Sequence, residues 1–256
     1  MKRICFFADV QYAPVQPRIG RMYDQGRSRL MRILETTRNE VDLYVNLGDF
    51  INGEEAYTSY AEMMSLCDSV GVDEKGVPIP FIHVPGNHDG FALPNEQLRG
   101  SGFSVHVLDD VHFIVLDGNY DWNGKPYGGV DGDWTKCLIP QAQVDALKAE
   151  LATCTSAVVL CHYVLDPRDT LAYTPKNVEE VRRILEESGK VQAVFQGHYH
   201  EGFEQVYNGI PYHTIPGVCE NIAGNGKVLY ATVDVEKGVL KNYARHECCH
   251  AWCWRI

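Results

Sequence analysis

Polar side chains able to bind metal ions follow five short apolar segments of the sequence, at the points where those segments end. They are Asp9 and Gln11, Asp49, Asn87 and His88, His162, and His198 and His200. Oxygen and imidazole donors without a thiolate suit hard or borderline divalent metals such as Mn²⁺, Fe²⁺ or Zn²⁺. In an open α/β sheet, ligands bind outside the carboxyl ends of the strands, so side chains far apart in sequence can converge on one crevice. The spacing therefore predicts a metal-dependent site.

Each of these residues also has an ordinary structural explanation when it is taken alone. Asp and Asn at strand ends are common in turns and helix caps, and a lone buried His162 would more often be a satisfied core residue. The ordered set favours the metal site over these separate explanations. The histidines that fit no part of the set are interpreted as structural: His83, His106, His112, His213 and His246.

The elements that must position these side chains are short strands alternating with amphipathic helices. Periodicity predicts strands over 2–8, 42–47, 79–84, 105–108, 112–116, 157–161 and 191–195, and helices over 23–39, 54–70, 140–151 and 175–187. Residues 117–139 lack periodicity and are predicted to form a long functional loop. Two hairpins are expected at the end, over 205–215 and 228–246. The chain is thus α/β with a late antiparallel segment, and a single domain is expected over 1–256.

Composition excludes several classes of protein. The chain has 256 residues and a formal net charge of −11, which argues against a nucleic-acid binder or a polybasic membrane binder. No apolar run is long enough for a membrane helix, and the one near the N-terminus is too short for a signal peptide. Nine cysteines without paired spacing favour reduced, buried thiols and a cytoplasmic protein. The tail from His246 to Cys253 offers thiols and imidazoles to a soft metal, but an ordinary final strand is favoured.

The ordered blocks of polar residues resemble the calcineurin-like metallophosphoesterase superfamily. The blocks are Asp9-Val10-Gln11, Gly48-Asp49, Gly86-Asn87-His88-Asp89, His162, and Gly197-His198-Tyr199-His200. The segment Tyr127-Gly128-Gly129-Val130-Asp131, which precedes His162, also resembles the middle region of the superfamily. The resemblance implies a four-layer α/β/β/α sandwich of two mixed sheets flanked by helices. It also implies that the terminal hairpins, from Gln205 onward, belong to the second sheet.

The same resemblance implies two divalent metal ions. Asp9, Gln11, Asp49 and His200 would hold the first ion, and Asp49, Asn87, His162 and His198 the second. Two such ions polarise a phosphoryl oxygen and lower the pKa of a bridging water, which becomes the nucleophile. His88 would stabilise the phosphoryl charge or protonate the leaving oxygen.

Two positions depart from the commonest pattern of the superfamily. Gln11 stands where most members have a His, and its neutral amide oxygen favours Mn²⁺ or Mg²⁺ over Zn²⁺. Asn52 stands where many members have an Asp that pairs with the catalytic His. Asn52 is expected to orient His88 by a hydrogen bond without balancing its charge.

Further blocks resemble the manganese-dependent ADP-ribose and CDP-alcohol diphosphatase branch. They are Asp9-Val10-Gln11-Tyr12, His198-Tyr199-His200-Glu201-Gly202 and Gly217-Val218-Cys219-Glu220. The resemblance implies hydrolysis of a small phosphodiester or pyrophosphate substrate, with Mn²⁺ as the metal and Fe²⁺, Mg²⁺ and Zn²⁺ as alternatives. A phosphomonoesterase and a non-catalytic scaffold are the alternative functions. Substrate contacts are expected from Asn87, His88, Tyr12 and Tyr199, and the oligomeric state stays open.

Overall fold

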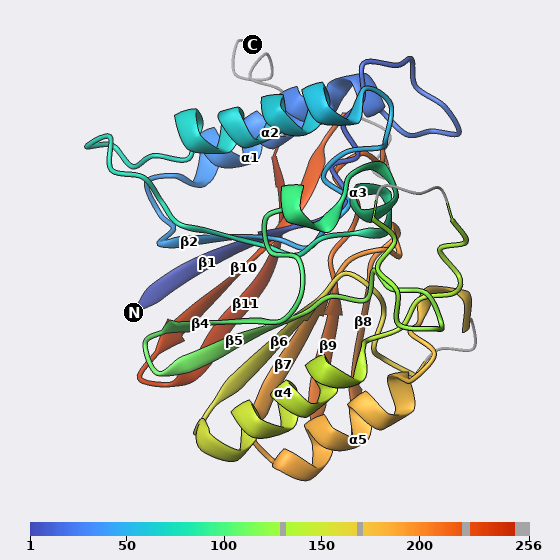
Figure 1. The fold of residues 1–256 in the computed structure, drawn as a ribbon. Helices are drawn as coiled ribbons and strands as arrows, with labels where there is room; N and C mark the ends of the chain where they lie inside the picture. Colours follow the sequence, from blue (N-terminus) through green and yellow to red (C-terminus); the bar gives the residue numbers. More distant parts are fainter. Residues whose placement is uncertain (129–131, 168–170, 222–225, 249–256) are drawn as a thin grey trace.

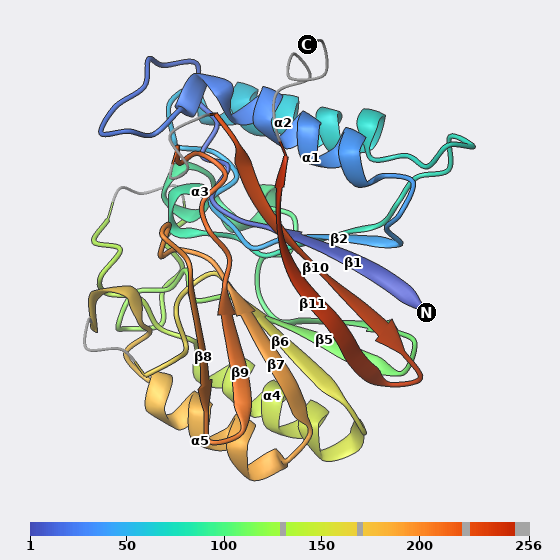
Figure 2. The same cartoon turned by 180° about the vertical axis from the view of Figure 1, so that it is seen from behind.

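The computed structural model describes residues 1–128, 132–167, 171–221 and 226–248. Within them the chain forms two mixed β-sheets that pack face to face, with helices on both outer faces (Figure 1). Figure 2 shows the same layers from behind, with the last two strands, in red, crossing the centre of the view. The architecture is the expected four-layer α/β/β/α sandwich.

Five strands form the first sheet: β1 (Lys2–Phe7), β2 (Leu43–Asn46), β3 (Phe81–His83), β10 (Val228–Glu236) and β11 (Val239–Cys248). Six form the second: β4 (Ser104–Leu108), β5 (Val111–Leu116), β6 (Ala157–Cys161), β7 (Val191–Gln196), β8 (Phe203–Tyr207) and β9 (Ile210–Thr214). The strand orders are β11-β10-β1-β2-β3 and β4-β5-β6-β7-β9-β8. In both sheets the strands that precede the predicted site residues run parallel to one another: β1, β2 and β3 in the first, β6 and β7 in the second.

The helices are α1 (Gly26–Thr37), α2 (Ala56–Val70), α3 (Asn87–Ala92), α4 (Gln141–Thr153) and α5 (Val178–Ser188), with 3-10 turns η1 (Tyr23–Gln25), η2 (Asn95–Gln97) and η3 (Leu171–Tyr173). Helices α1 and α2 cover the outer face of the first sheet, and α4 and α5 cover that of the second (Figure 1). The predicted strands and helices are present, most of them with shifted ends, and β6 has the predicted bounds. The short helix α3 was not predicted, and the described part of the loop 117–139 contains no helix or strand.

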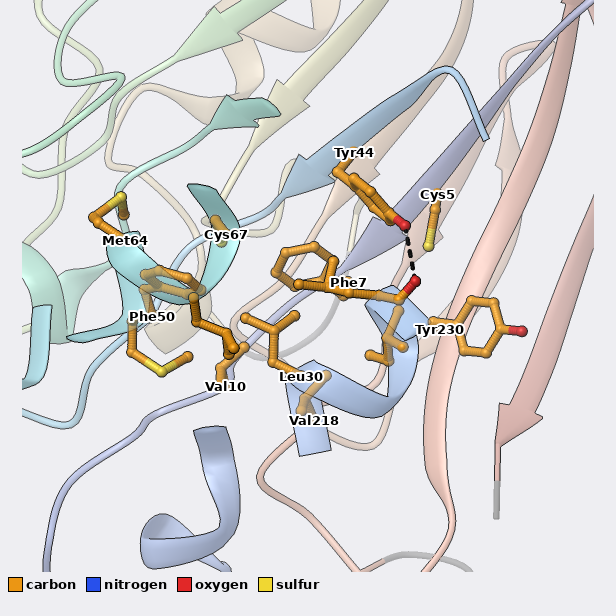
Figure 3. Packing of buried hydrophobic residues seen from close by; sticks show 14 of the residues in the cluster. Cys5, Phe7, Val10, Leu30, Tyr44, Phe50, Met64, Cys67, Val218 and Tyr230 are labelled. Carbon is orange, nitrogen blue, oxygen red and sulfur yellow. Dashed lines mark hydrogen bonds between the residues drawn. The ribbon is translucent and has the colours of Figure 1, made fainter. Parts of the chain in front are cut away.

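Side chains of one strand serve two layers of the core, because successive residues point to opposite faces. Cys5 and Phe7 of β1 pack beneath α1 and α2, whereas Ile4 and Phe6 pack between the two sheets. Figure 3 shows Phe7 beside Tyr44 and Leu30, which come from β2 and α1. The alternation explains why these strands read as continuous apolar runs in the sequence.

The interface between the sheets is closed by aromatic stacking. Phe6 of β1 and Phe195 of β7 are fully buried, and their ring centroids lie 4.0 Å apart with an interplanar angle of 8°. The two rings come from different sheets, so this contact holds together the strands whose ends carry Asp9 and His198.

The expectation that both terminal hairpins belong to the second sheet is wrong for one of them. The β8–β9 hairpin extends the six-stranded sheet, whereas the β10–β11 hairpin joins the first sheet, where β10 pairs antiparallel with β1. Most of β10 is buried, with residues in the core layers on both of its faces. A strand buried on both faces needs an interior position in a sheet, and β1 provides it.

Two features singled out in the sequence lie partly outside the described residues. They are the segment 127–131, of which 129–131 are not described, and the tail 246–253, of which Cys249, His250 and Cys253 are not described. Cys248 is described and is buried under α1 and α2 rather than offered to a metal. Among the described helices, none is long and apolar enough to cross a bilayer.

We expect Phe195→Ala to lower the free energy of unfolding by about 3–5 kcal/mol, because it removes a buried ring and leaves a cavity between the sheets. Urea denaturation of both proteins measures the difference. Phe203→Ala is the matched control, since Phe203 is 43% exposed on β8, and it should change stability by about 0.5 kcal/mol or less. Equal effects of the two substitutions would contradict the stacking interface.

Candidate metal centre

The predicted ligands gather at one end of the two sheets, on the loops that follow their strands. Oxygen and amide side chains come from the first sheet: Asp9 and Gln11 after β1, Asp49 after β2, and Asn87 after β3. Imidazoles come from the second sheet: His162 after β6, and His198 and His200 after β7. The site therefore lies across the seam between the sheets and needs both of them in place.

One group of donors surrounds the end of β1. The carboxylate oxygen Oδ1 of Asp9 lies 3.2 Å from Nε2 of His200. The side-chain nitrogen Nε2 of Gln11 donates a hydrogen bond to Oδ2 of Asp49 at 3.3 Å and lies 3.4 Å from Nε2 of His200. Asp9, Asp49 and His200 thus offer three donor atoms at spacing suited to a single ion.

A second group surrounds His162. Its Nε2 lies 3.4 Å from Oδ2 of Asp49, 3.2 Å from Oδ1 of Asn87 and 3.2 Å from Nδ1 of His198. The side chains of His162 and Asn87 are almost fully buried. The two groups share Oδ2 of Asp49.

These separations fit bound cations. Ligands about 2.1 Å from one divalent ion lie roughly 3.0–3.4 Å from each other, depending on whether the coordination is octahedral or tetrahedral. Oδ1 of Asp9 is buried and makes no hydrogen bond, and neither does Nε2 of His198. A buried carboxylate oxygen without a hydrogen-bond donor is unfavourable unless a cation faces it.

Backbone N–H groups fix which oxygen of each carboxylate is presented. Oδ1 of Asp49 accepts the N–H of His88 at 2.8 Å, which leaves Oδ2 for both donor groups. Oδ2 of Asp9 accepts the N–H of His198 at 3.1 Å, which leaves Oδ1 facing His200. The backbone therefore orients each carboxylate.

Neighbouring histidines keep the Asp49 carboxylate charged. Burial alone would raise the pKa of Asp49, but the adjacent His162 and His88 lower it well below its usual range. Burial would lower the pKa of His162, and the neighbouring Asp49 raises it to about 9. The imidazolium supplies positive charge at the place where a divalent cation would replace its proton.

In His162 and His200, a partner at Nδ1 leaves Nε2 as the ring nitrogen that can bind a metal ion. Nδ1–H of His162 donates to the carbonyl of Leu47 at 2.8 Å, so Nε2 is free to coordinate. Nδ1 of His200 lies 2.7 Å from Oε1 of Glu220, an oxygen that also accepts from Nε of Arg21 at 2.9 Å. Glu220 ends the block Gly217-Val218-Cys219-Glu220, but the sequence pattern does not predict its contact with His200. Such outer partners fix the orientation of a ligating imidazole.

The backbone around the site adopts conformations that are rare for side-chain-bearing residues. Asp9, Gln11, Asp49 and His198 have φ between 45° and 66°, in the left-handed region. A Cβ on Gly86 would lie 2.1 Å from Oδ1 of Asp49, so only glycine fits there. Such strain at strand ends is characteristic of functional sites and turns the donors into the crevice.

His88 lies at the edge of the second group, with Nε2 4.0 Å from Oδ2 of Asp49 and a side chain that is 32% exposed. Asn52 orients the His88 ring, as expected, but through its backbone carbonyl rather than its side chain. Nδ1 of His88 donates to the backbone carbonyl of Asn52 at 2.9 Å, whereas the Asn52 side chain donates to Glu54 at 2.6 Å. Any residue at position 52 can supply that carbonyl. His88 therefore keeps this hydrogen bond although position 52 is Asn rather than Asp.

The predicted substrate contacts of Tyr12 and Tyr199 are not on the cavity beside His88. The Tyr12 hydroxyl donates to Glu62, and the Tyr199 hydroxyl donates to Glu201. The cavity, about 410 Å³, is instead lined by Asn52, Gly53, Asn87, His88, Phe91, Ala92, Gly132 and Trp134. Sequence reasoning missed Phe91 because α3 was not predicted, and Trp134 because its loop has no periodic pattern.

Comparison with known proteins agrees with this geometry. The model of the calcineurin-like phosphoesterase family matches residues 2–202, which is most of the chain. The fold and the donor set define a metal-dependent phosphoric ester hydrolase. The chain belongs to the calcineurin-like phosphoesterase family. No curated protein sequence matched it.

Solved structures share the fold at low sequence identity. A dimetal phosphatase from Danio rerio is 19% identical with a TM-score of 0.78, over 98% of this chain and 99% of that one. A putative 5'-nucleotidase from Staphylococcus aureus is 14% identical with a TM-score of 0.57, over 100% of this chain and 56% of that one. A purple acid phosphatase from yellow lupin is 11% identical with a TM-score of 0.58, over 95% and 53%.

We expect Glu220→Gln to weaken metal binding at the Asp9–His200 group by about 10- to 100-fold, because the partner of the His200 Nδ1 is lost as a charged acceptor. Calorimetric titration of the metal-free protein with Mn²⁺ measures the affinity. Glu201→Gln is the matched control, since this exposed carboxylate is adjacent to His200 but contacts Tyr199. Unchanged affinity in Glu220→Gln would show that Glu220 does not support His200.

Proposed function

We propose that the two donor groups bind two divalent metal ions, with Asp49 bridging them. Asp9, Gln11, Asp49 and His200 would hold one ion, and Asp49, Asn87, His162 and His198 the other. The observation that carries this proposal is Asp49, which belongs to both groups of donors. Its Oδ2 accepts a hydrogen bond from Nε2 of Gln11 at 3.3 Å and lies 3.4 Å from Nε2 of His162. One oxygen thus faces both groups.

The reaction proposed for this centre is hydrolysis of a phosphodiester or pyrophosphate linkage. The two ions would supply Lewis-acid activation of water and neutralise charge on the phosphoryl group. The chain positions the substrate through Asn87 and His88. Because Nδ1 of His88 is held by the Asn52 carbonyl, Nε2 is left to stabilise phosphoryl charge or to give a proton to the leaving oxygen.

Manganese is the proposed metal because of Gln11. Its amide presents Nε2 toward Asp49 and His200 and Oε1 toward Sγ of Cys219 at 3.5 Å. The two ends of an amide have the same shape, so a half-turn brings the oxygen to the ion and the NH₂ to the sulfur. A neutral amide oxygen in place of an imidazole suits Mn²⁺ or Mg²⁺ better than Zn²⁺.

The proposed substrates are small molecules of the ADP-ribose or CDP-alcohol type, and the proposed location is cytoplasmic. The blocks that resemble the manganese-dependent diphosphatase branch support the substrate class, and in the structure two of them meet where Glu220 contacts His200. Cys5, Cys67, Cys137, Cys154, Cys161 and Cys219 are free and buried, which agrees with a reducing compartment.

Phosphate release from a substrate panel tests the proposal. Protein reconstituted with Mn²⁺ is offered ADP-ribose, CDP-choline, bis-p-nitrophenyl phosphate and p-nitrophenyl phosphate, with added phosphatase to reveal monoester products. We expect cleavage of ADP-ribose or CDP-choline to be preferred, and chelated protein to be inactive. Preference for p-nitrophenyl phosphate would identify a phosphomonoesterase instead. No turnover of any substrate, with no bound metal, would favour the scaffold alternative.

Gln11→His should raise the affinity for Zn²⁺ relative to Mn²⁺, because an imidazole is a better ligand for zinc than an amide oxygen. Competition between the two metals, followed by mass spectrometry of the native protein, measures the ratio. Gln97→His introduces the same side chain at an exposed position in η2 and should leave the ratio unchanged. If Gln11→His also left it unchanged, Gln11 would not be a ligand.

A further inference from the structure

The cavity beside His88 is lined by both polar and apolar side chains. Asn52, Asn87 and His88 supply polar atoms. Phe91, Ala92 and Trp134, which come from α3 and from the loop 117–139, supply apolar surface. A ligand that filled the cavity would therefore meet both polar groups and aromatic rings.

Phe91 is held in place from behind. Its ring stacks on that of Tyr127 at 4.3 Å between centroids, and the Tyr127 hydroxyl accepts a hydrogen bond from Tyr163 at 3.4 Å. A Cβ on Gly132 would lie 2.7 Å from the Phe91 ring, so the glycine makes room for it. Phe91 itself is only partly buried, which leaves part of its ring for contact with a ligand.

Trp134 packs against a predicted metal ligand. Its ring centroid lies 5.2 Å from that of His198, edge to face, and 5.3 Å from that of Tyr173. Trp134 is also partly buried. Phe91 and Trp134, each packed against a neighbouring ring, therefore line the same cavity as His88, the residue proposed to lie next to the phosphoryl group.

We propose that Phe91 and Trp134 bind the planar aromatic ring of the group esterified to the phosphoryl centre, such as a nucleobase. This assignment rests on the proposed function for the position of the phosphate and extends it to the substrate's organic part. Aromatic side chains stack on bases without hydrogen-bond readout, so the cavity selects a flat ring rather than one particular base.

Titration calorimetry of the Mn²⁺-loaded protein with AMP and with ribose 5-phosphate tests the assignment, because the two monoesters share the ribose phosphate and differ at C1, where AMP has adenine and ribose 5-phosphate has a hydroxyl group. We expect AMP to bind about tenfold more tightly to the wild-type protein. Phe91→Ala should remove most of that preference while leaving ribose 5-phosphate binding and the metal content unchanged. Trp134→Ala should also remove most of it, and is compared at equal metal content because the Trp134 ring packs against His198.

Trp122→Ala is the matched control. Trp122 lies on the same loop, is 48% exposed and packs against Lys176 rather than the cavity. It should keep the tenfold preference. Equal binding of the two monoesters to the wild-type protein, no binding of either, or a preference that survives in both Trp134→Ala and Phe91→Ala would overturn the assignment. The substrate panel reports separately on the proposed function, since bis-p-nitrophenyl phosphate hydrolysis by the wild-type protein does not depend on this comparison.

Discussion

Two buried carboxylates in one crevice, Asp9 and Asp49, set the constraint on which the rest of the site depends. Both are essentially inaccessible to solvent, and buried negative charge is unfavourable unless cations balance it. The imidazoles of His162 and His200 lie next to these carboxylates, on loops of the facing sheet. Backbone N–H groups donate to one oxygen of each carboxylate. The remaining oxygens are left facing the donors of the two proposed ion sites.

The fold meets this constraint by dividing the donors between the sheets. Carboxylate and amide groups follow strands of the first sheet, and histidines follow strands of the second. The crevice therefore exists only when the sheets are packed, and the stack of Phe6 on Phe195 belongs to the same arrangement as the ligands. Stability and metal binding are linked, because an ion that binds only the folded chain stabilises it.

That these side chains lie together could be predicted, because each comes shortly after an apolar strand and the order of the blocks is distinctive. The contacts that orient them were harder to predict. Leu47 and Asn52 act through backbone carbonyls, which carry no side-chain signal. Sheet membership of the last hairpin was predicted wrongly, since both terminal hairpins have the same pattern and only the burial of β10 on both faces separates them.

Electron paramagnetic resonance of the Mn²⁺-loaded protein, combined with the number of ions bound per chain, tests whether Asp49 joins two metal ions. Two ions bridged by one carboxylate lie about 3.5–4 Å apart and are magnetically coupled. We expect two ions and a coupled spectrum in the wild-type protein, and loss of the coupling in Asp49→Asn. A single ion per chain, or two ions with uncoupled spectra, would contradict a centre built around Asp49.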